Sequence, residues 1–128
     1  MRHAVYVVAV LSGFIASSAA DTYIKYCQDG VNGPTCQFMT ASNGVCYNVA
    51  GGYNDRVESV SIGTPENLWG QCVFWEDYNC KNDHTDMVTG VVNDMNSVCI
   101  GDNWRSRISS FKCCDTVSWC AGSRPNCT

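Results

Sequence analysis

The sequence predicts an all-β fold stapled by disulfides, and three observations carry that prediction. All ten cysteines of the 128-residue chain follow residue 20. Short runs of aromatic and β-branched residues alternate with clusters of Gly, Asn and Asp, which is typical of strands joined by tight turns. No window holds two turns of helical apolar periodicity. We therefore expect a small antiparallel sandwich or barrel, with at most a helical turn in a loop.

The clearest strand candidates are five runs that combine aromatic and β-branched residues. Turn sequences such as DGVNG, SNG, GGYND, YNCKND and GDN separate them. The residues GTPEN from Gly63 onward are expected to be a connector, and the sequence after residue 114 has little strand pattern. The runs are TYIKYC at 22–27, RVESVSI at 56–62, CVFW at 72–75, MVTGVV at 87–92 and RISSFKC at 107–113.

The first 20 residues have the layout of a secretory signal peptide. A basic start containing Arg2 precedes an apolar run at 4–15, and small residues lead to Asp21. An apolar run of about a dozen residues is short for a membrane span of roughly 20. We expect cleavage before Asp21, a secreted mature chain and no membrane span.

The cysteines predict a disulfide framework. An even number in a short exported chain indicates bridges, because the compartment is oxidising and a small core needs cross-links. Zinc is disfavoured, since no CxxC pair is present and the mature chain retains one histidine, His84. Adjacent Cys113 and Cys114 should lie on opposite faces of a strand and bond to different partners. We expect five bridges of unassigned pairing among Cys27, Cys36, Cys46, Cys72, Cys80, Cys99, Cys113, Cys114, Cys120 and Cys127.

The charge balance argues against nucleic-acid binding. Removing Arg2 with the signal leaves seven of the eight basic residues against twelve acidic ones, a net charge of −5 (7 − 12). No stripe of Lys and Arg runs along the chain, and such stripes are what bind phosphate backbones.

The chain also repeats itself weakly. Tyr26 precedes Ser59 by 33 residues, and Trp75 precedes Ser110 by 35. The serines end the similar sequences NDRVES and RSRISS. Two halves of about 45 residues, each with four strands, would bury their apolar faces against one another.

This pattern resembles the βγ-crystallin Greek-key motif. In that motif, an aromatic, four residues, an aromatic, one residue and a glycine form a folded hairpin, and a D/N-D/N-x-x-S/T-S segment closes the unit. VFWEDYNCKN with SRISSF matches it, with Trp75 as the first aromatic, Cys80 in the second aromatic place and Asn82 for the glycine. Asn tolerates the positive φ that this position requires. YCQDGVNG with NDRVES matches through Tyr26 and Gly33, with a valine in the second aromatic place.

The resemblance implies a βγ-crystallin-like sandwich of two Greek keys. The expected organisation is a signal peptide at 1–20 and a single domain at 21–128. Within the domain, the first Greek key spans about 22–62, the second about 70–113, and a Cys-rich tail covers 114–128.

Family members often bind calcium at these closing segments. The resemblance implies a shared site to which Asp55 and Ser109 contribute oxygens. Glu58 replaces a hydroxyl and Arg105 replaces an acid, so ligands that calcium needs are lost. At most a weak calcium site is expected at Asp55 and Ser109, and no other cofactor. The favoured interpretation is strand ends held by side-chain-to-backbone hydrogen bonds.

No residues form a convincing catalytic set. Glu76 and Asp77 are neighbours on an expected strand, so their side chains point to opposite faces and cannot converge on one substrate atom. Asp77 is better placed to cap a turn. His84 lies in a polar loop sequence, NDHTD, and no GxSxG nucleophile turn accompanies it. We expect no enzymatic activity.

The sequence allows two roles for each of two tryptophans, and it contains one glycosylation sequon. Trp69 in the connector and Trp119 in the tail either mark a binding surface or cover a small core under loops, and the second reading is favoured. Asn126 opens a formal glycosylation sequon with a cysteine in its middle.

Small secreted proteins resembling this one include yeast killer toxins, fungal apoplastic effectors and a bacterial metalloproteinase inhibitor, and the cysteine density is most similar to the fungal group. We expect a monomer that acts on a host or competitor protein or cell-surface component, as an effector or antimicrobial toxin. The alternatives are an extracellular protease inhibitor acting through a connector loop at 63–70, and a calcium-binding structural or matrix protein.

Overall fold

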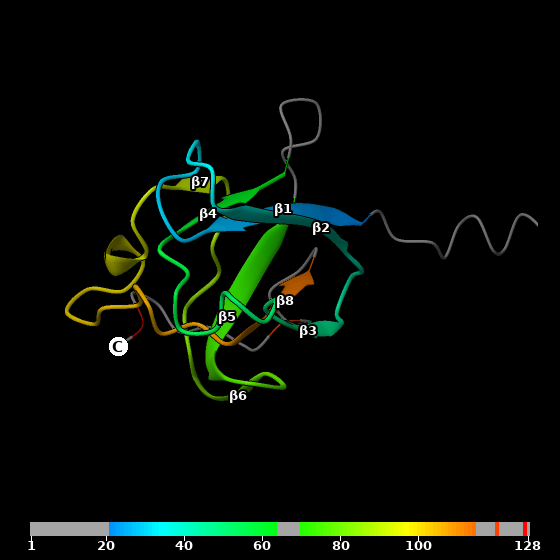
Figure 1. The fold of residues 1–128 in the computed structure, drawn as a ribbon. Coiled ribbons are helices and arrows are strands. Elements are labelled where there is room, and N and C mark those ends of the chain that lie inside the picture. Colours follow the sequence, from blue (N-terminus) through cyan, green and yellow to red (C-terminus); the bar gives the residue numbers. More distant parts are fainter. Residues whose placement is uncertain (1–20, 64–69, 115–119, 121–126, 128) are drawn as a thin grey trace, which may run out of the picture.

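The computed structural model describes residues 21–63, 70–114, 120 and 127. These residues form two four-stranded antiparallel sheets, one above the other in Figure 1. The expected signal peptide at 1–20 lies outside the described residues, and so do most of the connector and of the tail. The strands are β1 (Thr22–Cys27), β2 (Cys36–Ala41), β3 (Cys46–Asn48), β4 (Ser59–Ile62), β5 (Gln71–Asp77), β6 (Lys81–His84), β7 (Val91–Val92) and β8 (Ser110–Cys114).

The two halves exchange their third strands. Sheet A has the order β2-β1-β4-β7 and sheet B the order β3-β8-β5-β6. The first half therefore gives β3 to sheet B, where it pairs with β8, and the second half gives β7 to sheet A, where it pairs with β4. This is a sandwich of two interlocked Greek keys, so the predicted fold class is confirmed.

Among the elements of the described residues, one is helical and it is a single short turn. Met95–Ser97 form a 3₁₀ turn whose N-cap, Asp94, accepts a hydrogen bond from the Asn96 N–H at 2.9 Å. This agrees with the expectation of at most a helical turn in a loop. None of the described residues forms a helix long and apolar enough to span a bilayer.

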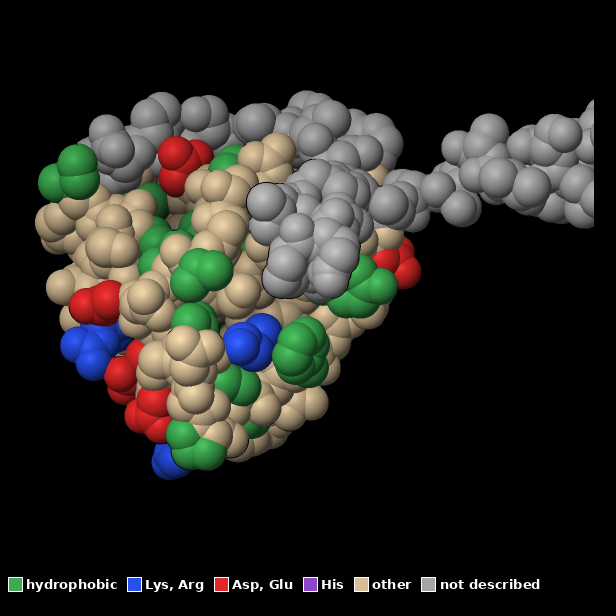
Figure 2. All heavy atoms as spheres, turned by 90° about the horizontal axis from the view of Figure 1, so that it is seen from above, with side chains coloured by type: hydrophobic (Ala, Val, Ile, Leu, Met, Phe, Trp, Pro, Cys, Tyr) green, Lys and Arg blue, Asp and Glu red, His purple; other side chains and the backbone are tan. Residues whose placement is uncertain are grey.

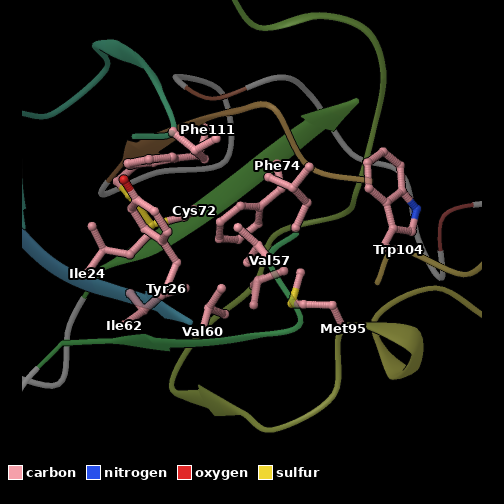
Figure 3. Packing of buried hydrophobic residues seen from close by; sticks show 14 of the residues in the cluster. Ile24, Tyr26, Val57, Val60, Ile62, Cys72, Phe74, Met95, Trp104 and Phe111 are labelled. Carbon is pink, nitrogen blue, oxygen red and sulfur yellow. A yellow bond between two sulfur atoms is a disulfide. The ribbon is translucent and has the colours of Figure 1, made fainter. Parts of the chain in front are cut away.

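The core lies between the sheets, and Phe111 contacts several of its aromatic rings (Figure 3). Its ring lies 5.7 Å from Tyr26 of sheet A, 5.7 Å from Tyr47 and 6.1 Å from Phe74. Alternation along the strands explains the arrangement, because residues two apart on a strand share a face. Ile24 and Tyr26 of β1 both point inward, and both are buried.

A second, smaller cluster covers the outer face of sheet B. Val73 and Trp75 are buried there and pack with Cys114 and Cys120. Because Cys120 belongs to the tail, the tail contributes to covering this face.

All ten cysteines are paired, which confirms the prediction of five disulfides. The neighbours Cys113 and Cys114 bond in opposite directions, as their alternation on β8 predicts. Cys113 joins the main core cluster, whereas Cys114 joins the outer cluster. The bridges are Cys27–Cys36, Cys46–Cys80, Cys72–Cys113, Cys99–Cys127 and Cys114–Cys120.

Replacing Phe111 with alanine should strongly destabilise the protein. Its ring is fully buried among three other aromatic rings, so the substitution leaves a cavity and should cost about 3–5 kcal/mol of unfolding free energy. Phe38→Ala is the matched control because that side chain is 66% exposed, and its cost should stay below about 0.5 kcal/mol. Urea unfolding at low protein concentration measures both. Equal costs would contradict the placement of the core.

The two cross-strand disulfides should differ in their contribution. Cys72–Cys113 closes a separation of 41 residues and Cys27–Cys36 one of 9. In the chain-entropy account, removing the first by double alanine substitution should cost about 4 kcal/mol and removing the second about 2.5 kcal/mol. Thermal and urea unfolding of the two double variants measure the difference. A larger loss for the short loop would argue against this account.

Candidate calcium-type site at the paired closing segments

The two segments predicted to close the Greek keys lie side by side and are related by an approximate two-fold. The Asp55 N–H donates to the Ile108 carbonyl at 3.0 Å, and the Ser106 N–H donates to the Val57 carbonyl at 3.1 Å. Asp55 and Ser106 also share a left-handed backbone, with φ of 58° and 57°. Position by position, 54–59 therefore corresponds to 105–110, as the sequence alignment predicts.

The final serine of each segment holds its folded hairpin. The Ser110 hydroxyl donates to the Asp77 carbonyl at 2.5 Å and accepts from the Cys80 N–H at 2.9 Å. The Ser59 hydroxyl donates to the Asp29 carbonyl in the same way. Both serines are buried, so these side-chain-to-backbone bonds satisfy groups that would otherwise lose water.

The structure corrects one part of the motif alignment. Ser59 pairs with Cys27 across β1 and β4, and Ser110 pairs with Trp75 across β5 and β8. Trp75 therefore corresponds to Cys27, and the counterpart of Tyr26 is Phe74. The prediction that matched Tyr26 with Trp75 is wrong by one residue. Because successive residues of a strand alternate faces, the observed register places Phe74 in the core and Trp75 on the outer face of sheet B.

The second hairpin turns through left-handed residues, as the Asn82 substitution suggests. Asn82 has φ of 70°, and Asn79 and Cys80 have φ of 66° and 55°. Cys80 is bonded to Cys46 of β3, so this hairpin is tied to the first half of the chain.

The structure brings the two predicted calcium ligands together. The Ser109 hydroxyl donates to Asp55 Oδ1 at 3.3 Å. Next to Asp55, the Asn54 side-chain oxygen is buried and has no hydrogen-bond partner. A carboxylate and a hydroxyl in contact, with an unpaired amide oxygen on the preceding residue, are oxygen groups of the kinds that bind calcium. No group of three or more His, Cys, Asp or Glu side chains that could hold a metal occurs in the described ranges.

The approximate two-fold relates the Asp55–Ser109 pair to a second position, and different residues lie there. Glu58 stands where the other half has Ser109, and its carboxylate accepts from the Arg105 guanidinium at 2.8 Å. The hydrogen bond and charge of Glu58, with the charge of Asp94, raise the pKa of Arg105 above its ordinary value. A permanent cation therefore sits where a dication would need oxygen ligands, and these residues do not fit calcium.

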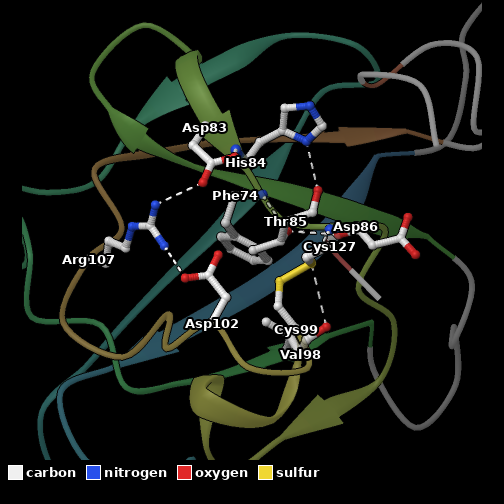
Figure 4. The surroundings of a disulfide bond; sticks show 10 residues. All are labelled: Phe74, Asp83, His84, Thr85, Asp86, Val98, Cys99, Asp102, Arg107 and Cys127. Atoms are coloured by element: carbon white, nitrogen blue, oxygen red, sulfur yellow. Dashed lines mark hydrogen bonds and ion pairs between the residues drawn. A yellow bond between two sulfur atoms is a disulfide. The ribbon is translucent and has the colours of Figure 1, made fainter. Parts of the chain in front are cut away.

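Arg107 is the hub of a larger ionic cluster (Figure 4). Its guanidinium lies 2.8 Å from Asp83, 2.8 Å from Asp102 and 3.0 Å from Glu76. It also lies over the Trp104 ring, 4.1 Å from the ring centre. Partial burial acts to lower the pKa of Arg107, but the hydrogen bonds to Glu76 and Asp83 and the charge of Asp102 raise it above its ordinary value.

Sequence reasoning missed the Arg107 cluster. Its acids lie 5, 24 and 31 residues away along the chain. No local spacing can therefore signal the cluster. Only the pairing of β5 with β6 and β8 brings these residues together.

The neighbouring acids Glu76 and Asp77 are engaged with different partners. Glu76 faces Arg107, whereas the Asp77 carboxylate accepts from the Asn82 amide at the turn. The His84 Nδ1 lies 2.8 Å from the Thr85 carbonyl, and its ring lies 5.4 Å from that of Trp75. Glu76 and Asp77 thus do not converge, in line with their alternation on a strand.

Several predicted features lie outside the described residues. Trp69, Trp119 and the Asn126 sequon fall there, as do residues 64–69 of the connector that would form an inhibitory loop. Trp104, by contrast, is fully buried in the core.

The exchanged strands and paired closing segments define the βγ-crystallin fold. Two solved structures share it. The βγ-crystallin domain of Abundant Perithecial Protein from Neurospora crassa, in its Ca²⁺-bound form, matches with a TM-score of 0.53 and 19% identity over 77% of this chain and 93% of that one. A βγ-crystallin from an archaeon matches with a TM-score of 0.54 and 20% identity over 73% and 98%.

At these identities the likeness establishes the fold. No model of a known protein family matches the chain, and no curated protein sequence matches it.

Replacing Arg107 with methionine should destabilise the protein in a salt-dependent way. The change keeps much of the side-chain volume but leaves three carboxylates without their cation. We expect a loss of about 1–2 kcal/mol at low salt. The loss should shrink in salt because the cluster is partly exposed and therefore screened.

Arg56→Met is the matched control, since Arg56 occupies the equivalent position in the first half and is exposed. Its unfolding free energy should change by less than about 0.5 kcal/mol. Urea titrations at two ionic strengths measure both variants. If the unfolding free energy lost in Arg107→Met is the same at both ionic strengths, an ionic role of Arg107 is contradicted.

Proposed function

We propose that this chain is an exported, non-enzymatic protein that acts on another organism, as an apoplastic effector or an antimicrobial toxin. The observation that carries the proposal is the complete pairing of the ten cysteines in five bridges. Such bridges persist in an oxidising environment, so the folded protein belongs in one. By opposing the unfolding that exposes cleavage sites, they would also protect it from extracellular proteases.

The polar side chains described above are engaged with one another within the protein. Arg105 and Arg107 are held by acids, and the Glu76–Asp77 pair is divided between an arginine and a turn. The net negative charge of the mature chain supports a protein or cell-surface partner in the target organism in preference to nucleic acid.

The proposal is tested by applying the oxidised mature protein to plant leaf tissue and to competing microbes. A reduced and alkylated sample is the control, because it has the same sequence without the fold. We expect death or growth arrest in one of the two systems and none with the control. Inertness of the oxidised protein in both systems would overturn the proposal.

A weak calcium site is a second candidate function, favoured by the contact between Asp55 and Ser109 and by the orphaned Asn54 oxygen. The Neurospora domain of the same fold is described in a Ca²⁺-bound form. Here Asp55, Ser109 and Asn54 would supply a carboxylate, a hydroxyl and an amide oxygen, which are the ligands that calcium takes.

Calcium should raise the melting temperature of the mature protein relative to chelator, and Asp55→Ala should abolish the rise. Binding to the folded state alone stabilises by mass action, by about 2.7 kcal/mol at a hundredfold excess over the dissociation constant. Glu58→Ala is the control in the symmetry-related segment and should leave the calcium effect unchanged. Equal melting temperatures in calcium and chelator would dispose of this candidate.

A further inference from the structure

The four strands at the sheet edges differ in how well they are protected against pairing with another chain. Strand β7 has two residues and β3 has three. Strand β6 carries Lys81 and Asp83 and has a register irregularity against β5. Short length, charge and bulges are the usual protections of an exposed edge.

Strand β2 has none of these protections. It is six residues long, reads CQFMTA without a charge or a proline, and keeps continuous register with β1 from Cys36 to Ala41. Strand β1 is its neighbour on one side in sheet A, and β2 forms the edge of that sheet.

The hydrogen-bond phase of the β1–β2 ladder shows which backbone groups face outward. The Gln28 N–H donates to the Thr35 carbonyl at 2.9 Å, in the register of the strand pair. Bonded pairs alternate along an antiparallel ladder. Gln37 and Met39 therefore direct their N–H and C=O groups to β1, while Phe38 and Thr40 direct theirs away from the sheet.

The pairing of β1 with β4 gives the same assignment of inward and outward backbone groups. The Gly63 N–H donates to the Tyr23 carbonyl at 2.7 Å, so Tyr23 faces β4 and its neighbour Ile24 faces β2. Because Ile24 is the register partner of Met39, the bonded pairs agree with those set by Gln28.

The outer face of sheet A beside this edge carries exposed apolar side chains. Phe38 is 66% exposed, with Lys25 Nζ 5.9 Å from its ring centre, and Tyr23 is 41% exposed. Figure 2 views this side and shows several apolar side chains, with acidic ones mostly near the rim. On sheet B the corresponding outer face is packed under Cys120, so its Trp75 is only 5% exposed.

We propose that the edge of β2 pairs with β2 of a second copy of this chain, in an antiparallel two-fold dimer centred on Phe38. The outward residues lie symmetrically about Phe38, so Phe38 meets its own counterpart and Cys36 meets Thr40 of the other copy. Each outward N–H then faces a carbonyl. The strand has no charge to repel its copy, and the two Phe38 rings form a cross-strand aromatic pair.

The dimer joins the two copies of sheet A into one continuous sheet. The inference goes beyond the proposed function and departs from the monomer expected from the sequence. It does not depend on either function proposed above.

Sedimentation velocity of the oxidised mature protein, over about three decades of concentration, tests the proposal. We expect a concentration-dependent change from monomer to dimer. Thr40→Pro removes an outward N–H without removing a bond to β1, and should raise the dissociation constant at least about tenfold. Thr40→Val keeps the N–H and the branched shape, and should dimerise like the parent.

Two further measurements apply if Thr40→Pro fails to fold. Phe38→Lys places like charges opposite one another across the two-fold and should abolish the dimer. Amide exchange should protect Gln37 and Met39 at every concentration, but Phe38 and Thr40 only where the dimer forms.

Three results would overturn the proposal. The first is a parent protein that stays monomeric at all concentrations. The second is a dimer that a folded Thr40→Pro variant and Phe38→Lys both leave intact. The third is a dimer in which the Phe38 and Thr40 amides exchange as fast as they do in the monomer.

Discussion

The exchange of third strands between the two halves is the constraint on which the rest of the structure depends. Strand β3 completes the sheet of the second half, and β7 completes the sheet of the first. The core formed by Tyr26, Phe74 and Phe111 therefore needs both halves, because these rings come from facing sheets. The Cys46–Cys80 bridge makes the same connection covalently, from β3 to the second hairpin.

The same two-fold arrangement places two chemically different segments in equivalent positions. Each segment contributes to both of the related sites: one site has the oxygens of Asp55 and Ser109, whereas at the other Arg105 is paired with Glu58. An arginine that meets several carboxylates holds a loop by charge and geometry, as a bound cation would. At the second site, an ion pair between the two halves of the chain joins the two segments.

Features set by local pattern could be predicted from the sequence. Because neighbouring residues of a strand face opposite sides, the sequence was sufficient to predict that Cys113 and Cys114 have different partners. The same reasoning predicted that the Glu76 and Asp77 side chains do not converge. The sequence also showed that NDRVES corresponds to RSRISS. The reciprocal backbone hydrogen bonds between the two segments confirm this correspondence in the structure.

Features that depend on strand pairing could not be predicted. Phe74 and Trp75 are adjacent aromatics, so composition cannot tell which one faces the core, and the motif alignment chose the wrong one. Cysteine pairing and the Arg107 cluster depend on residues brought together across the sheet. The exposed edge of β2 likewise becomes visible only when its neighbours are known.

The most direct test of the interlocked fold is the disulfide map of the oxidised mature protein, obtained by mass spectrometry of a non-reducing digest. The structure predicts that Cys46 of the first half is bonded to Cys80 of the second, and that Cys113 is bonded to Cys72 and Cys114 to Cys120. A map in which Cys46 is bonded within its own half, to Cys27 or Cys36, would contradict the exchange of strands between the two Greek keys.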